Sequence, residues 1–304
     1  MLTATKPPRA ILVLMRLDFL SVSVIKGQFI MTQRNWIGQS SPRSSTGKSA
    51  LVEPLPHHIS TDAIHVVFSA DPQIVARFLP PGLEPLEDGR GWGMVADMMK
   101  VSVAEPEQYW RDPQRSCYTE GLVGFYCRYK GKIYRYSAFV WVDRDWSMGM
   151  GQIFGWSKRL ATIHRTRINE TNPGLPERKT HGLKLAGTVE RHGRLVMRVD
   201  LSIDKDAVQL EKLPDFASTT LLYRYIASPG PKIAEVEQLL ELGFTNVNTT
   251  NIWAGQGQVH FGESDNEELS QLGAVKVIEA YTYKRGWTTD TQAVLLKDYT
   301  ASNI

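Results

Sequence analysis

Short apolar segments, many with a polar residue at every second position, recur through most of the chain and predict β-strands. Residues 65–69 form a β-branched run that includes Phe68. Residues 92–103 are almost continuously apolar, which predicts a buried strand with Asp97 as its exception. A lone acidic side chain in such a strand turns outward or points into a pocket, and the pattern leaves both open.

Two pairs of segments predict β-hairpins. Residues 123–128 and 133–142 are rich in aromatic and β-branched residues and are joined by a turn that contains Lys130-Gly131. Residues 183–203 alternate between apolar and polar positions on either side of His192-Gly193. The charged positions of this second pair fit the solvent face of a half-buried antiparallel sheet.

Helical signals are few. Asp71-Pro72 is a good helix start, with an N-cap and a proline in the first turn, and this helix must end before Pro80-Pro81-Gly82. Residues 106–115 are polar and aromatic and predict a loop, residues 233–242 are ambiguous, and residues 286–304 contain a polar tail. We therefore expect a mainly β (α+β) chain with a few short helices.

Further strands are expected over residues 221–226, 246–262 and 280–284. Arg224 stands between two tyrosines in the first of them. It is either a solvent-facing residue of the sheet or a clamp for a substrate carboxylate.

The ends of the chain differ in character from its middle. Residues 10–30 are rich in Leu, Val and Ile but are interrupted by Arg16, Asp18 and Lys26, so no run reaches the length of a membrane span. Residues 1–30 are expected to form an upstream extension, and residues 31–56, which are rich in Ser, Gln, Arg and Pro, a mobile arm. This places a single domain at residues 57–290 and a tail at residues 291–304.

Composition narrows the class of protein. The chain has 304 residues, 22% of them charged, and a formal net charge of +3, which gives no reason to expect nucleic acid or an acidic membrane as a partner. Cys117 and Cys127 form neither a disulfide framework nor a zinc motif, and a reduced, cytoplasmic setting is the expectation.

The sequence lacks the motifs of metal sites, serine hydrolases and dinucleotide-binding proteins. The histidines show no metal-ligand spacing apart from His57-His58, and the chain has neither a Gly-x-Ser-x-Gly elbow nor a dinucleotide-binding Gly-x-Gly-x-x-Gly after a strand. We therefore expect no metal and no bound cofactor.

The strongest chemical signal lies in residues 149–166. A lead-in whose glycines are expected to make it flexible, and an apolar run with Phe154 and Trp156, precede two adjacent cations, Lys158 and Arg159, and apolar residues follow. Most such pairs are solvated, because long cationic side chains extend to water. A lysine in apolar surroundings beside another positive charge is instead pushed towards its neutral amine, which is a nucleophile for ketones and aldehydes.

The stretch Gly155-Trp156-Ser157-Lys158-Arg159-Leu160 resembles the Gly-aromatic-Pro-Lys-Lys-Leu signature of the acetoacetate decarboxylase family. The exit Leu79-Pro80-Pro81-Gly82-Leu83-Glu84 and the run Cys117-Tyr118-Thr119-Glu120 resemble softer motifs of that family, and the similarity spans about residues 62–286. The resemblance implies a curled antiparallel sheet or barrel, in agreement with the many short strands. It also implies a homo-oligomer that acts on a small keto acid.

The resemblance assigns roles by position. Lys158 would form the Schiff base, Arg159 would hold its amine neutral, and Glu120 would position substrate or shuttle a proton. Tyr118, Phe154 and Trp156 would line a dry substrate pocket.

Departures from the family pattern keep alternatives open. Ser157 replaces a proline, Arg159 replaces a lysine and could instead bind the substrate acid, and no arginine stands near residue 61, where the decarboxylase uses one. The expected activity is decarboxylation of a β-keto acid. The alternatives are an aldolase-dehydratase or cyclase that uses the same lysine, and a barrel that only binds a small acid.

Overall fold

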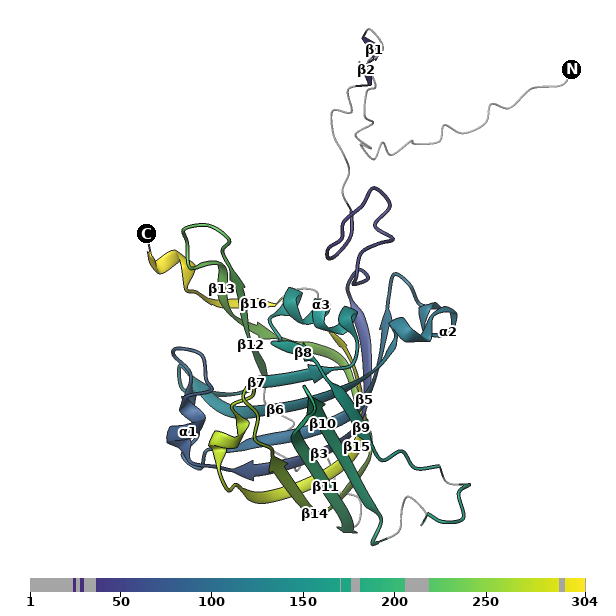
Figure 1. Ribbon diagram of the computed structural model, residues 1–304, viewed down its shortest axis with the longest axis vertical. Helices are drawn as coiled ribbons and strands as arrows, with labels where there is room; N and C mark the ends of the chain where they lie inside the picture. Colours follow the sequence, from purple (N-terminus) through teal and green to yellow (C-terminus); the bar gives the residue numbers. More distant parts are fainter. Residues whose placement is uncertain are drawn as a thin grey trace, which may run out of the picture.

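Fourteen strands form one curled sheet in this computed structural model, which describes residues 24–25, 28–29, 37–169, 171–175, 181–205, 219–289 and 293–303 (Figure 1). The strand order is β16-β13-β12-β7-β6-β5-β3-β15-β14-β11-β10-β9, with β4 paired to β6 and β8 paired to β7. Neighbours are antiparallel except for β12 with β7 and β7 with β8. The predicted curled, mainly antiparallel fold is confirmed.

The strands of this sheet are β3 His57–Ser69, β4 Glu84–Pro85, β5 Gly91–Ser102, β6 Cys117–Tyr129, β7 Lys132–Val142, β8 Lys158–Leu160, β9 Thr162–Arg165, β10 Lys184–Arg191, β11 Arg194–Lys205, β12 Thr220–Ala227, β13 Ala234–Leu242, β14 Phe244–Phe261, β15 Lys276–Thr289 and β16 Val294–Asp298. A separate pair consists of β1 Val24–Ile25 and β2 Gln28–Phe29. The α-helices are α1 Pro72–Ala76, α2 Gln108–Arg111 and α3 Asp145–Phe154, and there are 3₁₀ turns at Pro113–Arg115, Leu269–Leu272 and Thr300–Asn303.

In both predicted hairpins, the turn contains two residues with positive φ. Lys130 and Gly131 have φ of 48° and 82° between β6 and β7, and His192 and Gly193 have φ of 52° and 72° between β10 and β11. Two successive residues with positive φ match the right-handed twist of the strands they join. Both hairpins are confirmed.

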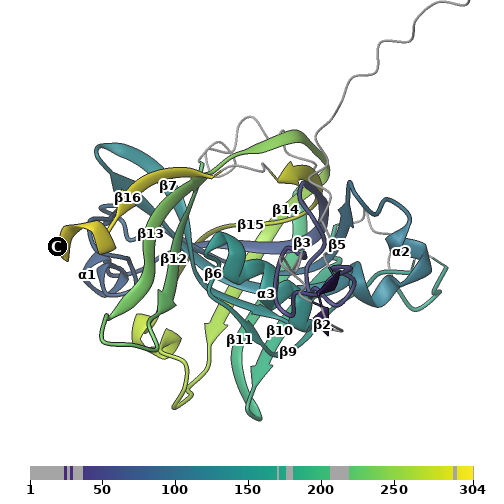
Figure 2. The same cartoon turned by 90° about the horizontal axis from the view of Figure 1, so that it is seen from above.

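The central strands bury both of their faces. Along β6, Val123 and Phe125 point into one core, whereas Leu122 and Tyr126 point into another. The first core is closed by β9, β10 and β11, and the second by α3 and by parts of β14 and β15 (Figure 2). Burial on two sides explains the almost continuous apolar character of β5.

Asp97 of β5 turns away from the second core. Its carboxylate forms ion pairs with Arg165 at 2.8 Å and with Arg167 at 2.7 Å. Asp97 also lines an open pocket of about 640 Å³ together with Asp62 and Arg167, so it faces away from the second core and borders a pocket at the same time.

Two local expectations are corrected, and one segment left ambiguous by the sequence is resolved. Residues 106–115 contain α2 and a 3₁₀ turn rather than a plain loop. The ambiguous residues 233–242 contain β13, and the expected tail contains the end of β15 and all of β16, which pairs with β13. In β13 and β16, pairing with another strand decides the conformation, because local propensity is weak against tertiary contacts.

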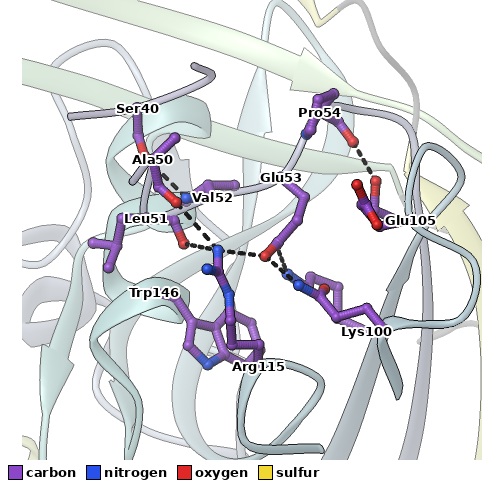
Figure 3. A network of polar contacts seen from close by, with 12 residues as sticks. Ser40, Ala50, Leu51, Val52, Glu53, Pro54, Lys100, Glu105, Arg115 and Trp146 are labelled. Atoms are coloured by element: carbon purple, nitrogen blue, oxygen red, sulfur yellow. Dashed lines mark hydrogen bonds and ion pairs between the residues drawn. The ribbon is translucent and has the colours of Figure 1, made fainter. Parts of the chain in front are cut away.

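Residues 50–56 belong to the folded domain, although we expected them in a mobile arm. Ala50, Val52 and Glu53 are buried. Figure 3 shows the Glu53 carboxylate between the ends of Lys100 and Arg115, with which it forms ion pairs. The domain therefore begins before residue 57. Of the expected extension 1–30, only residues 24–25 and 28–29 lie within the described part.

Candidate active site

Helix α3 leads directly into the strand that carries Lys158. The Asp145 carboxylate accepts a hydrogen bond from the Trp146 N–H at 2.7 Å, at the positive end of the helix. Gly155 ends the helix at φ 104°, and a Cβ there would lie about 3 Å from the backbone of Arg224. We expected the glycines before Lys158 to form a flexible lead-in, but Gly149 and Gly151 lie inside α3.

Gly151 makes room for the lysine. A Cβ at this position would stand 2.9 Å from Lys158 Cγ and 2.7 Å from the Trp156 carbonyl oxygen. The lysine side chain thus passes directly over the helix backbone, which only glycine permits at this distance.

Lys158 ends in a buried polar contact. Its Nζ donates to Glu120 Oε2 at 2.9 Å and to Ser147 Oγ at 3.1 Å, and the lysine side chain is 4% exposed. Nζ also lies 5.3 Å from the ring centroid of Tyr118 and 5.6 Å from that of Trp156. The amine therefore sits among aromatic rings, with one carboxylate within proton-transfer distance.

These groups line a cavity of about 150 Å³ that is partly open to solvent. Lys158, Glu120, Tyr118, Phe154 and Trp156 all line it, so the structure brings five of the six expected site residues together. Apolar side chains of the second core, such as those of Met94, Met98 and Leu122, complete much of the wall.

Tyr118 remains a neutral phenol. Burial raises the pKa of Tyr118 well above its ordinary value, and the neighbouring Glu120 carboxylate raises it further. At neutral pH this side chain is a hydrogen-bond donor at the wall of the cavity.

Arg159 is the expected site residue that does not join the cavity. Alternation along β8 turns it to the opposite face of the sheet from Lys158. There it forms an ion pair with Glu267 at 2.8 Å, and its guanidinium lies 5.5 Å from the ring centroids of Phe139 and Trp141. The expected role of Arg159 beside the lysine amine or on the substrate acid finds no support in this arrangement.

Arg224 is also absent from the lining. It lies half-buried in β12, with its backbone against Gly155. The cationic groups that line the cavity besides Lys158 are Arg135 and Arg285, which the sequence analysis did not single out.

The sequence contains only a weak indication that Arg135 and Arg285 face the cavity. Each stands at a position that alternation assigns to the same strand face as other lining residues, Ser137 in β7 and Tyr283 in β15. Ser147 was likewise missed, because its approach to Lys158 depends on α3.

Among the residues that the structure describes, no group of three or more His, Cys, Asp or Glu side chains is arranged to hold a metal ion. The helices found there are all too short or too polar to cross a bilayer.

Comparison with solved structures shows the same fold in several enzymes. An acetoacetate decarboxylase-like enzyme from Sphingomonas wittichii RW1 is 24% identical, with a TM-score of 0.79 over 86% of this chain and all of the other. The enduracididine biosynthesis enzyme MppR, complexed with pyruvate, is 26% identical, with a TM-score of 0.77 over 87% of this chain and 99% of the other. Acetoacetate decarboxylase from Legionella pneumophila is 16% identical, with a TM-score of 0.66 over 81% of this chain and 89% of the other.

Comparison with curated protein sequences gave no match. The sequence profile of the acetoacetate decarboxylase family matches residues 40–299, which include every strand from β3 to β16 and the whole cavity around Lys158. The chain therefore belongs to the acetoacetate decarboxylase family.

Proposed function

We propose that this protein is a lyase that forms a Schiff base between Lys158 and a small keto acid. The observation that carries the proposal is the position of Lys158 Nζ, which is buried against aromatic rings and 2.9 Å from Glu120. The cavity of about 150 Å³ suits a small acid, because pockets for drug-sized ligands are about 300–1,000 Å³.

The geometry supports a defined sequence of steps. Glu120 takes a proton from the lysine ammonium, and the free amine attacks the ketone carbon. Glu120 returns its proton to the hydroxyl of the carbinolamine, which leaves as water, and a positively charged iminium remains. This iminium accepts the electron pair of a breaking carbon–carbon bond.

In a decarboxylase the bond that breaks is the one to the carboxyl carbon of a β-keto acid. Carbon dioxide leaves, the resulting enamine takes a proton at carbon, and water hydrolyses the imine to release the ketone and restore the amine. The proton that the enamine takes comes from solvent, and Glu120 is placed to relay it.

A second candidate reaction uses the same iminium for condensation. It is favoured by MppR, one structure of which is complexed with the condensation product of pyruvate and imidazole 4-carboxaldehyde and is 26% identical to this chain. In an aldolase-dehydratase or cyclase, the enamine of a 2-keto acid attacks an aldehyde carbon instead of taking a proton.

Borohydride trapping tests the proposal. The full chain is incubated with pyruvate or with acetoacetate, reduced, digested and mapped by mass. We expect one adduct on the peptide that contains Lys158, its loss in Lys158→Arg, and its retention in the control Lys132→Arg, whose lysine side chain is 56% exposed. Absence of any adduct at Lys158 with a panel of 2- and 3-keto acids would make the protein a binder rather than an enzyme of this kind.

Product analysis separates the two reactions. Carbon dioxide released from acetoacetate indicates the decarboxylase. Pyruvate consumed only in the presence of an aldehyde indicates condensation.

A further inference from the structure

Ser147 of α3 carries a buried hydroxyl that contacts Lys158 directly. Its side chain is fully buried, and its Oγ accepts a hydrogen bond from Lys158 Nζ at 3.1 Å. Ser147 is not among the described residues that line the cavity. It therefore touches the reacting nitrogen without standing in the space that a substrate would fill.

A second contact connects Ser147 to Tyr118. The two side chains form a hydrogen bond, and the ring centroid of Tyr118 lies 5.3 Å from Lys158 Nζ. Because Ser147 Oγ accepts a proton from the lysine, its own proton is available to the phenol oxygen of Tyr118. The phenol lines the cavity and can donate its proton to a group bound there. Hydrogen bonds thus run in one direction, from Nζ through Ser147 and Tyr118 to the cavity.

Packing holds Tyr118 in this position, and its surroundings keep it protonated. Its ring meets the ring of Trp146, the residue before Ser147, edge-on at a centroid distance of 5.1 Å. Burial raises the pKa of Tyr118 well above its ordinary value and the Glu120 carboxylate raises it further, whereas the hydrogen bond from Ser147 acts in the opposite direction without cancelling them. At neutral pH the phenol therefore has a proton to give.

The proposed reaction needs a proton carrier besides Glu120. Attack of the free amine on the ketone leaves a positively charged nitrogen that must lose a proton and an alkoxide oxygen that must gain one. At that moment Glu120 holds the proton that it took from the lysine ammonium, and it uses this proton afterwards to release the hydroxyl as water. The transfer from nitrogen to oxygen therefore falls to other groups.

We propose that Ser147 and Tyr118 are catalytic residues that relay a proton from the Lys158 nitrogen to the substrate oxygen. The nitrogen gives an N–H proton to Ser147 Oγ, Ser147 gives its own proton to the phenol oxygen of Tyr118, and Tyr118 gives its proton to the alkoxide. The nitrogen becomes neutral, the alkoxide becomes a hydroxyl, and Ser147 and Tyr118 end with one proton each, as they began. This inference rests on the proposed function, to which it adds the step that forms the carbinolamine hydroxyl.

Timed borohydride trapping measures this step. The full chain is mixed with pyruvate and reduced after set intervals, and the adduct on the peptide that contains Lys158 is measured by mass. Ser147→Ala and Tyr118→Phe each remove one hydroxyl of the relay. We expect each to slow the appearance of the adduct by roughly 10²-fold, the lower end of the range for a lost general acid or base, since water can replace part of the relay.

The double variant separates a relay from two independent contributions. Removal of either hydroxyl breaks the same chain, so the variant with both Ser147→Ala and Tyr118→Phe should be about as slow as either single variant. Independent roles would multiply to a loss of roughly 10⁴-fold. A multiplied loss would overturn the relay.

A role for Ser147 in holding the lysine alone gives another pattern. Ser147→Ala would then be slow while Tyr118→Phe matched the unmutated protein, and this result would also overturn the inference. The controls are Ser116→Ala and Tyr136→Phe, which remove buried hydroxyl-bearing side chains from outside the described lining of the cavity. Both controls should give the adduct at the rate of the unmutated protein.

The same measurements separate this inference from the proposed function. Adduct at Lys158 in the unmutated protein, with Ser147→Ala and Tyr118→Phe equally fast, would leave the Schiff-base function standing and overturn the relay. No adduct at Lys158 in the unmutated protein, with pyruvate or with any other keto acid of the panel, would overturn both.

Discussion

At the scale of single residues, the site depends on which way side chains point from short strands. Lys158 and Arg159 are adjacent, yet alternation along β8 sends one into the cavity and the other to Glu267 on the far face. Adjacent charges in a sequence predict proximity only when the local backbone is known.

Arg159 provides the sharpest test of this difference. Because its side chain lies on the opposite face of the sheet from Lys158, Arg159→Met should leave the rate and pH dependence of trapping near wild type. The free energy of unfolding should fall by about 1–3 kcal/mol, since the buried Glu267 loses one charged partner and keeps Arg191 at 3.0 Å. The two measurements are trapping across a pH series and urea unfolding. A large shift in the pH dependence, with stability unchanged, would restore the role that we first expected from the motif.

Glu120 is predicted to handle the proton of the lysine. Glu120→Gln keeps the size of the side chain and its contact with Nζ but accepts no proton. Turnover of the best substrate should fall by roughly 10²- to 10⁴-fold, the usual cost of a lost general acid or base. The isosteric control is Glu241→Gln in β13, which should retain activity because Glu241 contacts Lys132 and Tyr134 outside the cavity. Unchanged turnover in Glu120→Gln would remove Glu120 from the proposed mechanism.

At the scale of elements, α3 connects Lys158 to the N-terminal segment at residues 50–56. Ser147 contacts Lys158, and its neighbour Trp146 has its ring 4.4 Å from Lys100 Nζ. Lys100 in turn is fully buried and is paired with Glu53 of residues 50–56 (Figure 3). A stretch that we expected to be a mobile arm thus helps to hold the helix that supports the lysine.

Removing Glu53 should therefore be costly. Glu53→Ala leaves the Lys100 ammonium buried without its carboxylate, which typically costs about 3–5 kcal/mol. The matched control is Glu105→Ala, which breaks an exposed pair with Arg111 and should cost at most about 1 kcal/mol. Urea unfolding of both variants gives the comparison. Similar losses in the two would mean that the buried pair contributes no more than a surface pair does.

Some elements and site residues could be predicted from the sequence and others could not. The difference lies in whether local residues or distant strand pairing determines them. Turn residues with positive φ and an N-cap at Asp71 are local signals, so the hairpins and α1 were predictable. The roles of Lys158 and Glu120 were predicted from short motifs that resemble those of the family. Arg285 enters the cavity because β15 pairs with β3, more than two hundred residues away, and no local pattern encodes that register.

At the scale of the whole molecule, burial of neutral histidines makes stability depend on pH. Burial, with a further contribution from Lys100, lowers the pKa of His57 to about 4, and burial lowers the pKa of His65 well below its ordinary value. The unfolded chain takes up protons on these groups near pH 6.5, whereas the folded protein does not. Their stabilising effect is fully present above about pH 6.5 and is lost as the pH falls towards 4.

For His57 alone, this loss should reach about 2 kcal/mol at pH 5. Urea unfolding at pH 7.5 and pH 5 measures it. His57→Gln should reduce the difference between the two pH values, whereas the control His260→Gln, at an exposed position of β14, should not. Equal stability of the unmutated protein at both pH values would contradict the prediction.

The pairing of β3 with β15 also bears on how the chain is made. During synthesis β3 emerges early and finds β5 soon afterwards, but its other edge has no partner until residues 276–288 leave the ribosome. At about 5–20 residues per second, some two hundred residues take roughly 10–40 s. For that time β3 presents an open row of backbone donors and acceptors, the kind of edge on which nascent chains aggregate. Arg285 and Tyr283 arrive on the same late strand, so the nascent protein completes the cavity around Lys158 only when almost the whole chain has been translated.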